Sequence, residues 1–342
     1  MKKFIYFVIA ISITLVFSSC ASSASSTRPS GRIVIYTSMY PDVITSLNRA
    51  LQRQFPNITI DFVYGGTGQI QARVASEIAR GKLGADILMV AEPAYSVELK
   101  ELGLLHSFIS SQAASLAFDY DQDGAWYPVR VSNMVLAFNP QRYNRDAVPV
   151  SFYDFANERR YRGAVAMSNP LTSGTTKAAI TALRDKYGYE FFNALGSQNI
   201  AIESSAVALP KLEIGEWRAV MVLEESVLRR RQEAMSALEI IYPSDGTIMI
   251  PSTIMIVDGK WSASNNTKAA EHIANWLLSV EGQHVIVDGW MHSVRKDFTR
   301  SPFGSIPLAE IKANSMPFNW ENSVRGRQEI LFMFEDMVTS RR

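Results

Sequence analysis

Two short turns combine glycine with hydroxyl side chains directly before a predicted helix. One is the Gly-Gly-Thr-Gly run at residues 65–68, and the other is the Thr-Ser-Gly-Thr-Thr run at residues 172–176. Free backbone N–H groups, hydroxyl donors and the positive end of the helix dipole make such turns suited to binding an anion. Capping of the helices by Thr67 or Thr175 would by itself also explain each turn.

Three acidic residues form a second candidate set. Glu224 and Glu225 follow a predicted strand, and Asp245 lies in the Pro-Ser-Asp-Gly-Thr run at residues 243–247. A carboxylate about 4 Å from a phosphate would be repelled by roughly 4 kcal/mol at an effective dielectric constant near 20, so these acids would have to face another part of an anionic ligand. Sugar hydroxyls or an ammonium group would suit them. A solvated helix start is the alternative interpretation of the Glu pair.

Other chemistries have weaker support in the sequence. The four histidines, His106, His272, His284 and His292, have no close ligand spacing and no cysteine partner, so no metal site is expected. Residues 119–124 resemble the opening of a calcium loop, but Arg130 stands where a bidentate Glu is needed, which favours a surface turn. The chain has no nucleophile-elbow or Walker-type motif. We therefore expect a binding protein, with no catalytic residue and no cofactor.

The elements that must position these residues follow a strand, loop, helix order. The sequence predicts strands at 32–36, 58–63 and 86–90, and helices at 41–54, 69–80 and from Pro93 to about Gly103. Alternating elements of this kind predict a mostly parallel sheet with helices on both faces. Ligands of such sheets bind beyond the carboxyl ends of the strands, which is where both glycine-containing turns are expected.

The chain length of 342 residues predicts about two domains. Residues 126–139 are apolar, aromatic and extended, and we expect them to carry the chain into a second lobe with strands near 163–167, 200–203 and 219–223. A strand at 252–257 returns the chain, and an amphipathic helix covers 267–278. The predicted division is lobe one at 31–138 plus 252–342, with C-terminal helices on either lobe, and lobe two at 139–251.

The first twenty residues have the layout of an export signal. Two lysines precede an apolar run at residues 4–17, which is too short to span a bilayer, and Cys20 ends the segment. Cys20 is the only cysteine, and its position predicts a lipidated protein with residues 1–20 as signal and the Ser-rich residues 21–30 as tether. Cleavage near Ser22 or Ala24, or an uncleaved anchor, is the alternative.

The formal net charge of +1 implies no surface for polyanions, so we expect no nucleic-acid partner.

Together these segments resemble a known family. The resemblance rests on Cys20, the Gly-Gly-Thr-Gly turn, Ala-Asp-Ile-Leu-Met at 85–89, Ser-Gly-Thr at 173–175, Asn-Trp-Leu-Leu-Ser at 275–279 and Glu-Gly-Gln at 281–283. Residues 32–295 resemble an extracellular solute-binding protein of an ABC importer, in the branch that takes ferric ions, thiamine and sugar phosphates. The resemblance implies a two-lobed α/β fold of the type II periplasmic-binding-protein class. Each lobe would be a mostly parallel sheet flanked by helices, with the ligand in the inter-lobe cleft.

The same resemblance implies the partners and the location. We expect a monomer that is exported to the periplasm or the cell surface and held to the membrane by a lipid anchor. Its partners would be a small anionic ligand and an ABC permease in the cytoplasmic membrane. Phe17 departs from the Leu that is usual three residues before a lipidated cysteine, which weakens the anchor assignment.

Departures from the family pattern bear on the ligand. Ferric binders of this branch carry a Tyr-Tyr pair after the strand that corresponds to 219–223, whereas this chain has Leu223, Glu224 and Glu225 there. Sugar-phosphate members carry acids at this place and in a Pro-x-acid-Gly-Thr motif, which resembles Glu224, Glu225 and Asp245. The resemblance therefore implies a sugar phosphate or an organophosphonate. The expected ligand-binding residues are Thr37, Ser38, Thr67, Gly68, Ser173, Gly174, Thr175, Ser205, Glu224, Glu225 and Asp245.

Two alternatives stay open at this point. One is a ferric-ion carrier without the tyrosine pair, in which Glu224, Asp245 and a synergistic anion hold the metal. The other is a secreted hydrolase that uses Glu224 and Glu225 as acid and base, although adjacent side chains point in divergent directions.

Overall fold

The computed structural model describes residues 29–317 and 326–340, so the predicted signal, the lipidation site Cys20 and most of the tether lie outside the described residues. The strands are β1 Gly31–Thr37, β2 Ile58–Tyr64, β3 Ile87–Val90, β4 Leu105–His106, β5 Trp126–Phe138, β6 Val165–Met167, β7 Ala201–Ile202, β8 Ala219–Leu223, β9 Glu239–Ile241 and β10 Ile248–Val257. The extended segment predicted at 126–139 is strand β5.

Helices alternate with these strands along the chain. They are α1 Pro41–Gln54, α2 Thr67–Ile78, α3 Pro93–Glu101, α4 Phe152–Asn157, α5 Gly174–Tyr187, α6 Glu190–Ser197, α7 Ser205–Ile214, α8 Glu224–Ala234, α9 Thr267–Leu278, α10 Val280–Asp288, α11 Leu308–Ala313 and α13 Arg327–Phe334. Short 3₁₀ turns cover Ala113–Ser115, Arg145–Ala147 and Arg159–Tyr161, and a π turn covers Glu335–Thr339. No helix in these ranges is long and apolar enough to cross a membrane.

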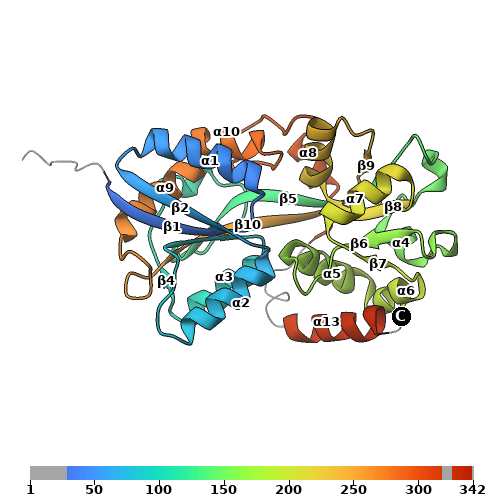
Figure 1. Cartoon of the computed structure of the whole chain (residues 1–342), viewed down its shortest axis with the longest axis horizontal. Helices are drawn as coiled ribbons and strands as arrows, with labels where there is room; N and C mark the ends of the chain where they lie inside the picture. The colour runs from blue at the N-terminus through green and yellow to red at the C-terminus, as the bar shows by residue number, and fades with distance from the viewer. Residues whose placement is uncertain (1–28, 318–325, 341–342) are drawn as a thin grey trace, which may run out of the picture.

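The strands form one sheet in the order β2-β1-β3-β10-β5-β8-β6-β7. Parallel pairs lie at both ends of this order, with β1 between β2 and β3 and with β6 between β7 and β8. The long antiparallel strands β5 and β10 lie between the two parallel sets and pair with each other, as Figure 1 shows. The predicted α/β fold with two parallel-stranded halves is confirmed.

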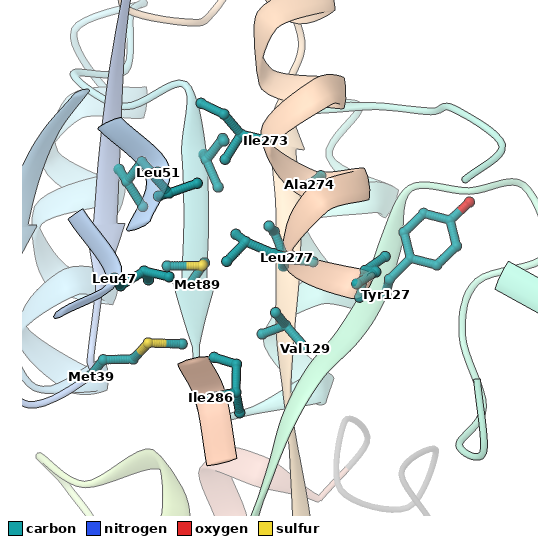
Figure 2. Packing of buried hydrophobic residues seen from close by; sticks show 14 of the residues in the cluster. Met39, Leu47, Leu51, Met89, Tyr127, Val129, Ile273, Ala274, Leu277 and Ile286 are labelled. Atoms are coloured by element: carbon teal, nitrogen blue, oxygen red, sulfur yellow. The ribbon is translucent and has the colours of Figure 1, made fainter. Parts of the chain in front are cut away.

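A hydrophobic core lies in each half of the molecule, and we call the half around each core lobe one and lobe two. In lobe one, Leu47 and Leu51 of α1 pack against Met89 of β3 and against Ile273 and Leu277 of α9 (Figure 2). The apolar spacing of α1 places these leucines on one face, and all five side chains are buried. Helices α1, α9 and α10 therefore cover one face of the lobe-one strands, while α2 and α3 cover the other (Figure 1).

The core of lobe two joins Leu136 and Phe138 of β5 to the helices around β6. The C-terminal helix α13 belongs to this core through Ile330 and Phe334, and Figure 1 shows it beside α5 and α6. Its hydrophobic side therefore packs on lobe two. The boundaries at residues 138/139 and 251/252 stay a prediction, because β5 and β10 run through both halves.

Two predicted elements begin elsewhere in the structure. Helix α2 starts at Thr67 and not at residue 69, because the Gln69 side chain accepts a hydrogen bond from the Gly66 N–H at 3.0 Å and fixes an earlier first turn. Strand β10 starts at Ile248 and not at residue 252, because Ile248 pairs with Met134 of β5. A bulge between Ser252 and Thr253 interrupts that ladder.

Candidate functional site

A cavity of about 250 Å³ lies between the two lobes. Loops after the parallel strands of both lobes line it, so the carboxyl ends of the two parallel sets face one another across the cavity. The lining residues from lobe one are Ser38, Tyr40, Tyr64, Gly66, Thr67 and Ala91, and β5 adds Arg130 and Met134. Lobe two adds Ser168, Asn169, Thr172–Thr176, Ile202–Ser205, Met221–Leu223, Glu225 and Ser226.

Several helices begin at this cavity. They include α2 from lobe one and α5, α7 and α8 from lobe two. Ser173 caps α5 by accepting a hydrogen bond from the Thr176 N–H at 3.2 Å, whereas the residues before α2 and α7, Gly66 and Ser204, make no side-chain cap. First-turn N–H groups lack partners within a helix, so these helix ends offer donors and positive potential to one small volume. The cavity is suited to an anion.

Seven of the predicted ligand-binding residues line the cavity: Ser38, Thr67, Ser173, Gly174, Thr175, Ser205 and Glu225. Thr37 and Gly68 lie next to it in the chain but not in its wall. The buried Thr37 hydroxyl accepts from the Met39 N–H at 3.2 Å, and the Gly68 N–H donates to the Thr172 carbonyl at 3.2 Å. The structure therefore brings together the residues of the two glycine-containing turns.

Asp245 does not lie at the cavity, contrary to the expectation from the sequence. Its carboxylate accepts from the backbone N–H groups of Phe152 and Tyr153, both at 3.0 Å, and from the Tyr187 hydroxyl at 2.7 Å. These bonds hold the first turn of α4 against α5. Asp245 thus has a structural partner for each oxygen and is not retained in the proposed site.

Glu224 is also placed away from the cavity, behind its wall. The carboxylate is 1% exposed and accepts from Asn133 Nδ2 at 2.6 Å, from His292 Nε2 at 2.9 Å, and from the hydroxyls of Tyr242 and Ser305. Burial alone would raise the pKa of Glu224, but the His292 ring and the two hydroxyls lower it below its usual value. Glu224 is neither a solvated helix start nor a residue of the cavity wall.

Arg130, Glu203 and Glu225 are the charged residues of the cavity wall, and Glu203 is paired with Lys211 at 2.6 Å. Glu225 is 2% exposed and accepts from the Ser132 hydroxyl at 2.7 Å; burial raises its pKa, although the Arg130 charge acts in the opposite direction. The Arg130 guanidinium is also buried and donates to Met291 Sδ at 2.8 Å and to Ser38 Oγ at 3.4 Å. Sequence reasoning missed Arg130. The available signal was a lone arginine inside the apolar segment that forms β5.

The two lobes also make direct contacts with each other. Besides the bond from Gly68 to Thr172, the hydroxyls of Tyr40 and Ser226 lie 2.5 Å apart. Lys177 of α5 reaches into lobe one, where its Nζ lies 3.2 Å from the buried Glu92 carboxylate. The two lobes are therefore in direct contact at three places.

Metal ligands do not gather anywhere in residues 29–317 and 326–340: no three His, Cys, Asp or Glu side chains come together there as a metal site. In the predicted turn at 119–124, Asp121 and Asp123 both accept from Lys100 Nζ at 2.6 Å. Two of the acidic side chains that resemble a calcium loop are thus paired with a lysine.

Solved structures with the same fold include carriers of different solutes. Iron-bound HitA from Pseudomonas aeruginosa shares 20% identity with a TM-score of 0.77, over 90% of this chain and 99% of that one. AfuA from Actinobacillus pleuropneumoniae, with exogenous fructose 6-phosphate bound, shares 18% identity with a TM-score of 0.77, over 90% and 99%. The ferric binding protein from Campylobacter jejuni shares 17% identity with a TM-score of 0.73, over 89% and 99%. At these identities the likeness shows the fold alone.

Comparison with sequence families identifies the wider family. No curated protein matches the chain. A family model described as bacterial extracellular solute-binding protein matches residues 84–303, which is well over half of the sequence and includes most of the cavity wall. The chain therefore belongs to the bacterial extracellular solute-binding proteins.

Proposed function

We propose that this protein captures a small phosphorylated solute, a sugar phosphate or an organophosphonate, and delivers it as a monomer to an ABC permease. The observation that carries the proposal is the meeting of helix N-termini, among them those of α2, α5 and α7, at one cavity between the lobes. Hydroxyl groups of Thr67, Thr175 and Ser205 line the same volume. Backbone donors and hydroxyls around a helix start are the usual ligands of a phosphate group.

The ferric-ion alternative has less support. Tyr40 and Tyr64 line the cavity but come from different loops. Burial, with the nearby Glu225 charge, raises the pKa of Tyr40 to about 12, which disfavours the phenolate that Fe(III) requires. With Glu224 and Asp245 engaged elsewhere, the acids suggested for an iron site do not converge. The phosphorylated solute is the better proposal.

The hydrolase alternative also loses its acid–base pair. Glu224 is surrounded by donors behind the cavity wall, while Glu225 faces the cavity. A general acid and a general base must both reach the reacting group. We propose a binding role without catalysis.

Native mass spectrometry of protein purified from its source tests the proposal directly. We expect a co-purified mass that corresponds to a phosphorus-containing organic compound. A bound ferric ion, or a co-purified solute without phosphorus, would contradict the proposal.

Thr175→Val is expected to weaken binding of the phosphorylated solute by about 1.5–3 kcal/mol, because it removes one donor to a charged group at nearly constant shape. Calorimetry with glucose 6-phosphate, 2-aminoethylphosphonate and inorganic phosphate measures the change. Thr181→Val is the matched control, since the Thr181 hydroxyl bonds to the Lys177 carbonyl within α5 and lies outside the cavity wall. Equal affinities of the two variants would mean that the Thr175 hydroxyl does not contact the ligand.

We also propose that Cys20 carries a lipid anchor, on the pattern of the preceding residues. Cys20→Ser is then expected to move the protein from the membrane fraction to the soluble fraction, with loss of the lipid mass in intact-protein mass spectrometry. Ser23→Ala in the same segment is the control and should leave fractionation as it is. A Cys20→Ser protein that stays with the membrane argues for an uncleaved signal as the anchor.

A further inference from the structure

Arg130 places a buried guanidinium in the cavity wall, and this guanidinium has few hydrogen-bond acceptors around it. The side chain is 3% exposed and lines the cavity wall. Its acceptors are a thioether sulfur, Met291 Sδ at 2.8 Å, and the Ser38 hydroxyl at the long distance of 3.4 Å. Over the described part of the chain, no carboxylate lies within ion-pair distance of it. A guanidinium carries five N–H donors, so this one has donors to spare for a ligand.

Glu225 presents the opposite charge to the same cavity. One of its oxygens accepts from the Ser132 hydroxyl at 2.7 Å, and the side chain is 2% exposed. Its charge and that of Arg130 act on each other without a direct ion pair. Arg130 and Glu225 are thus two opposite charges of the cavity wall that form no ion pair with each other. The third charged residue of the wall, Glu203, is paired with Lys211 at 2.6 Å.

The charges at this end of the cavity restrict what can bind there. An ammonium group beside Glu225 would lie near the Arg130 cation, and a second phosphate or carboxylate beside Arg130 would lie near the Glu225 anion. An uncharged group avoids both repulsions. It can bind both residues if it offers an acceptor to the guanidinium and a donor to the carboxylate. A hydroxyl group is both a hydrogen-bond donor and an acceptor. Two hydroxyls on neighbouring carbons therefore offer a donor and an acceptor at two positions of the solute.

We propose that Arg130 and Glu225 are the specificity-determining residues of the cleft and that they bind neighbouring hydroxyls at the uncharged end of the solute. This rests on the proposed function, which assigns the phosphate to the starts of α2, α5 and α7. The solute class is then a phosphorylated polyol or sugar. Aminoalkylphosphonates are selected against, because their ammonium group would meet Arg130.

The wild-type protein already tests the proposal by calorimetry with four compounds. We expect glucose 6-phosphate or fructose 6-phosphate to bind at least about 10-fold more tightly than both 2-aminoethylphosphonate and inorganic phosphate, since hydrogen bonds to charged groups are lost with the latter two. Binding of 2-aminoethylphosphonate as tight as that of both hexose phosphates overturns the selection proposed here and leaves the phosphorylated-solute function standing. Binding of none of the four compounds overturns the proposed function itself.

Glu225→Gln and Arg130→Met then test the two residues. Each is expected to weaken binding of the preferred hexose phosphate by about 10- to 100-fold and to leave inorganic phosphate within about two-fold. Glu213→Gln and Arg230→Met are the matched controls. Glu213 and Arg230 form an ion pair of 2.7 Å between α7 and α8, outside the cavity wall, so these controls should bind as the wild type does.

The variant results separate the remaining explanations. If both variants bind the hexose phosphate like the wild type, Arg130 and Glu225 do not contact the solute and the inference fails. If Arg130→Met loses hexose phosphate and inorganic phosphate equally, Arg130 holds the phosphate and the inference also fails. Circular dichroism and thermal unfolding identify a misfolded variant, in which case the wild-type compound series decides.

Discussion

Replacing Gly68 by alanine is expected to weaken binding of the phosphorylated solute by about 10- to 100-fold without removing any group that contacts it. A Cβ atom at position 68 would lie 2.9 Å from the Leu171 carbonyl oxygen and 3.0 Å from Thr172 Cα, which are backbone atoms of the other lobe. Such overpacking costs about 1–3 kcal/mol. If the lobes move apart when no solute is bound, the separated lobes are free of this clash, so the fraction able to hold the solute between the lobes should fall and the apparent Kd should rise in proportion.

Two measurements and one control isolate this effect. Calorimetry gives the loss of affinity, and small-angle X-ray scattering with solute present should give a larger radius for Gly68→Ala than for the wild type. Gly65→Ala is the control in the same turn, because a Cβ there would be 3.4 Å from the flexible Gln69 side chain and no closer to anything else. Wild-type affinity in Gly68→Ala would mean that the lobes close without the contact between Gly68 and Thr172.

A second set of contacts between the lobes is formed by charged side chains. Glu92 follows β3 in lobe one, and its carboxylate lies 3.2 Å from Lys177 Nζ and 3.3 Å from Arg327 Nε. Burial lowers the pKa of Lys177, although Glu92 acts in the opposite direction. Lys177 is in the first turn of α5, directly after Thr175 and Thr176. The segment proposed to hold the phosphate is thus tied to lobe one by a charged contact.

Local patterns were enough to predict most elements of lobe one. The apolar spacing of residues 43–51 and the proline at position 41 specify α1, because they act within one helix. Strands β4, with Leu105 and His106, and β9, with Glu239–Ile241, are too short to show a period, and pairing with β10 and β5 gives them their conformation. The missed start of β10 has the same cause, since its first residues are extended through pairing with β5.

The residues of the candidate site could be predicted from the sequence only where the topology of the sheet determines their position. Ser38, Thr67 and Ser173 were predicted at the site because loops after parallel strands converge in an α/β sheet, whatever the side-chain contacts are, and all three line the cavity. Glu224 was misplaced because its partners are distant in the chain: His292 lies 68 residues further on, and no spacing rule relates the two. Arg130 was not predicted for a similar reason, since the role proposed for it depends on Glu225, which is distant in the chain and lines the same cavity.

Glu224→Gln is expected to lower the free energy of unfolding by about 3–5 kcal/mol at neutral pH, the cost of removing one partner from a buried pair. The Gln amide keeps one acceptor oxygen, but its NH₂ group would face donors from Asn133, His292 or Ser305. The pKa of Glu224 in the fold is lowered, so its stabilising contribution is present above the unfolded pKa, about 4.3, and is lost as the pH falls through the folded value. The stability difference between wild type and variant should therefore shrink below about pH 4.

Glu225, the neighbouring residue, is expected to affect the free energy of unfolding in the opposite direction and serves as the matched control. Burial raises the pKa of Glu225, so its ionised form costs stability above the unfolded pKa, and Glu225→Gln should leave the free energy of unfolding at neutral pH unchanged or higher. Chemical denaturation of both variants at neutral pH and at about pH 3.5 measures the two signs. Equal losses of stability at the two positions, or a Glu224→Gln loss that persists undiminished in acid, would mean that the cluster around His292 does not hold Glu224 as a carboxylate.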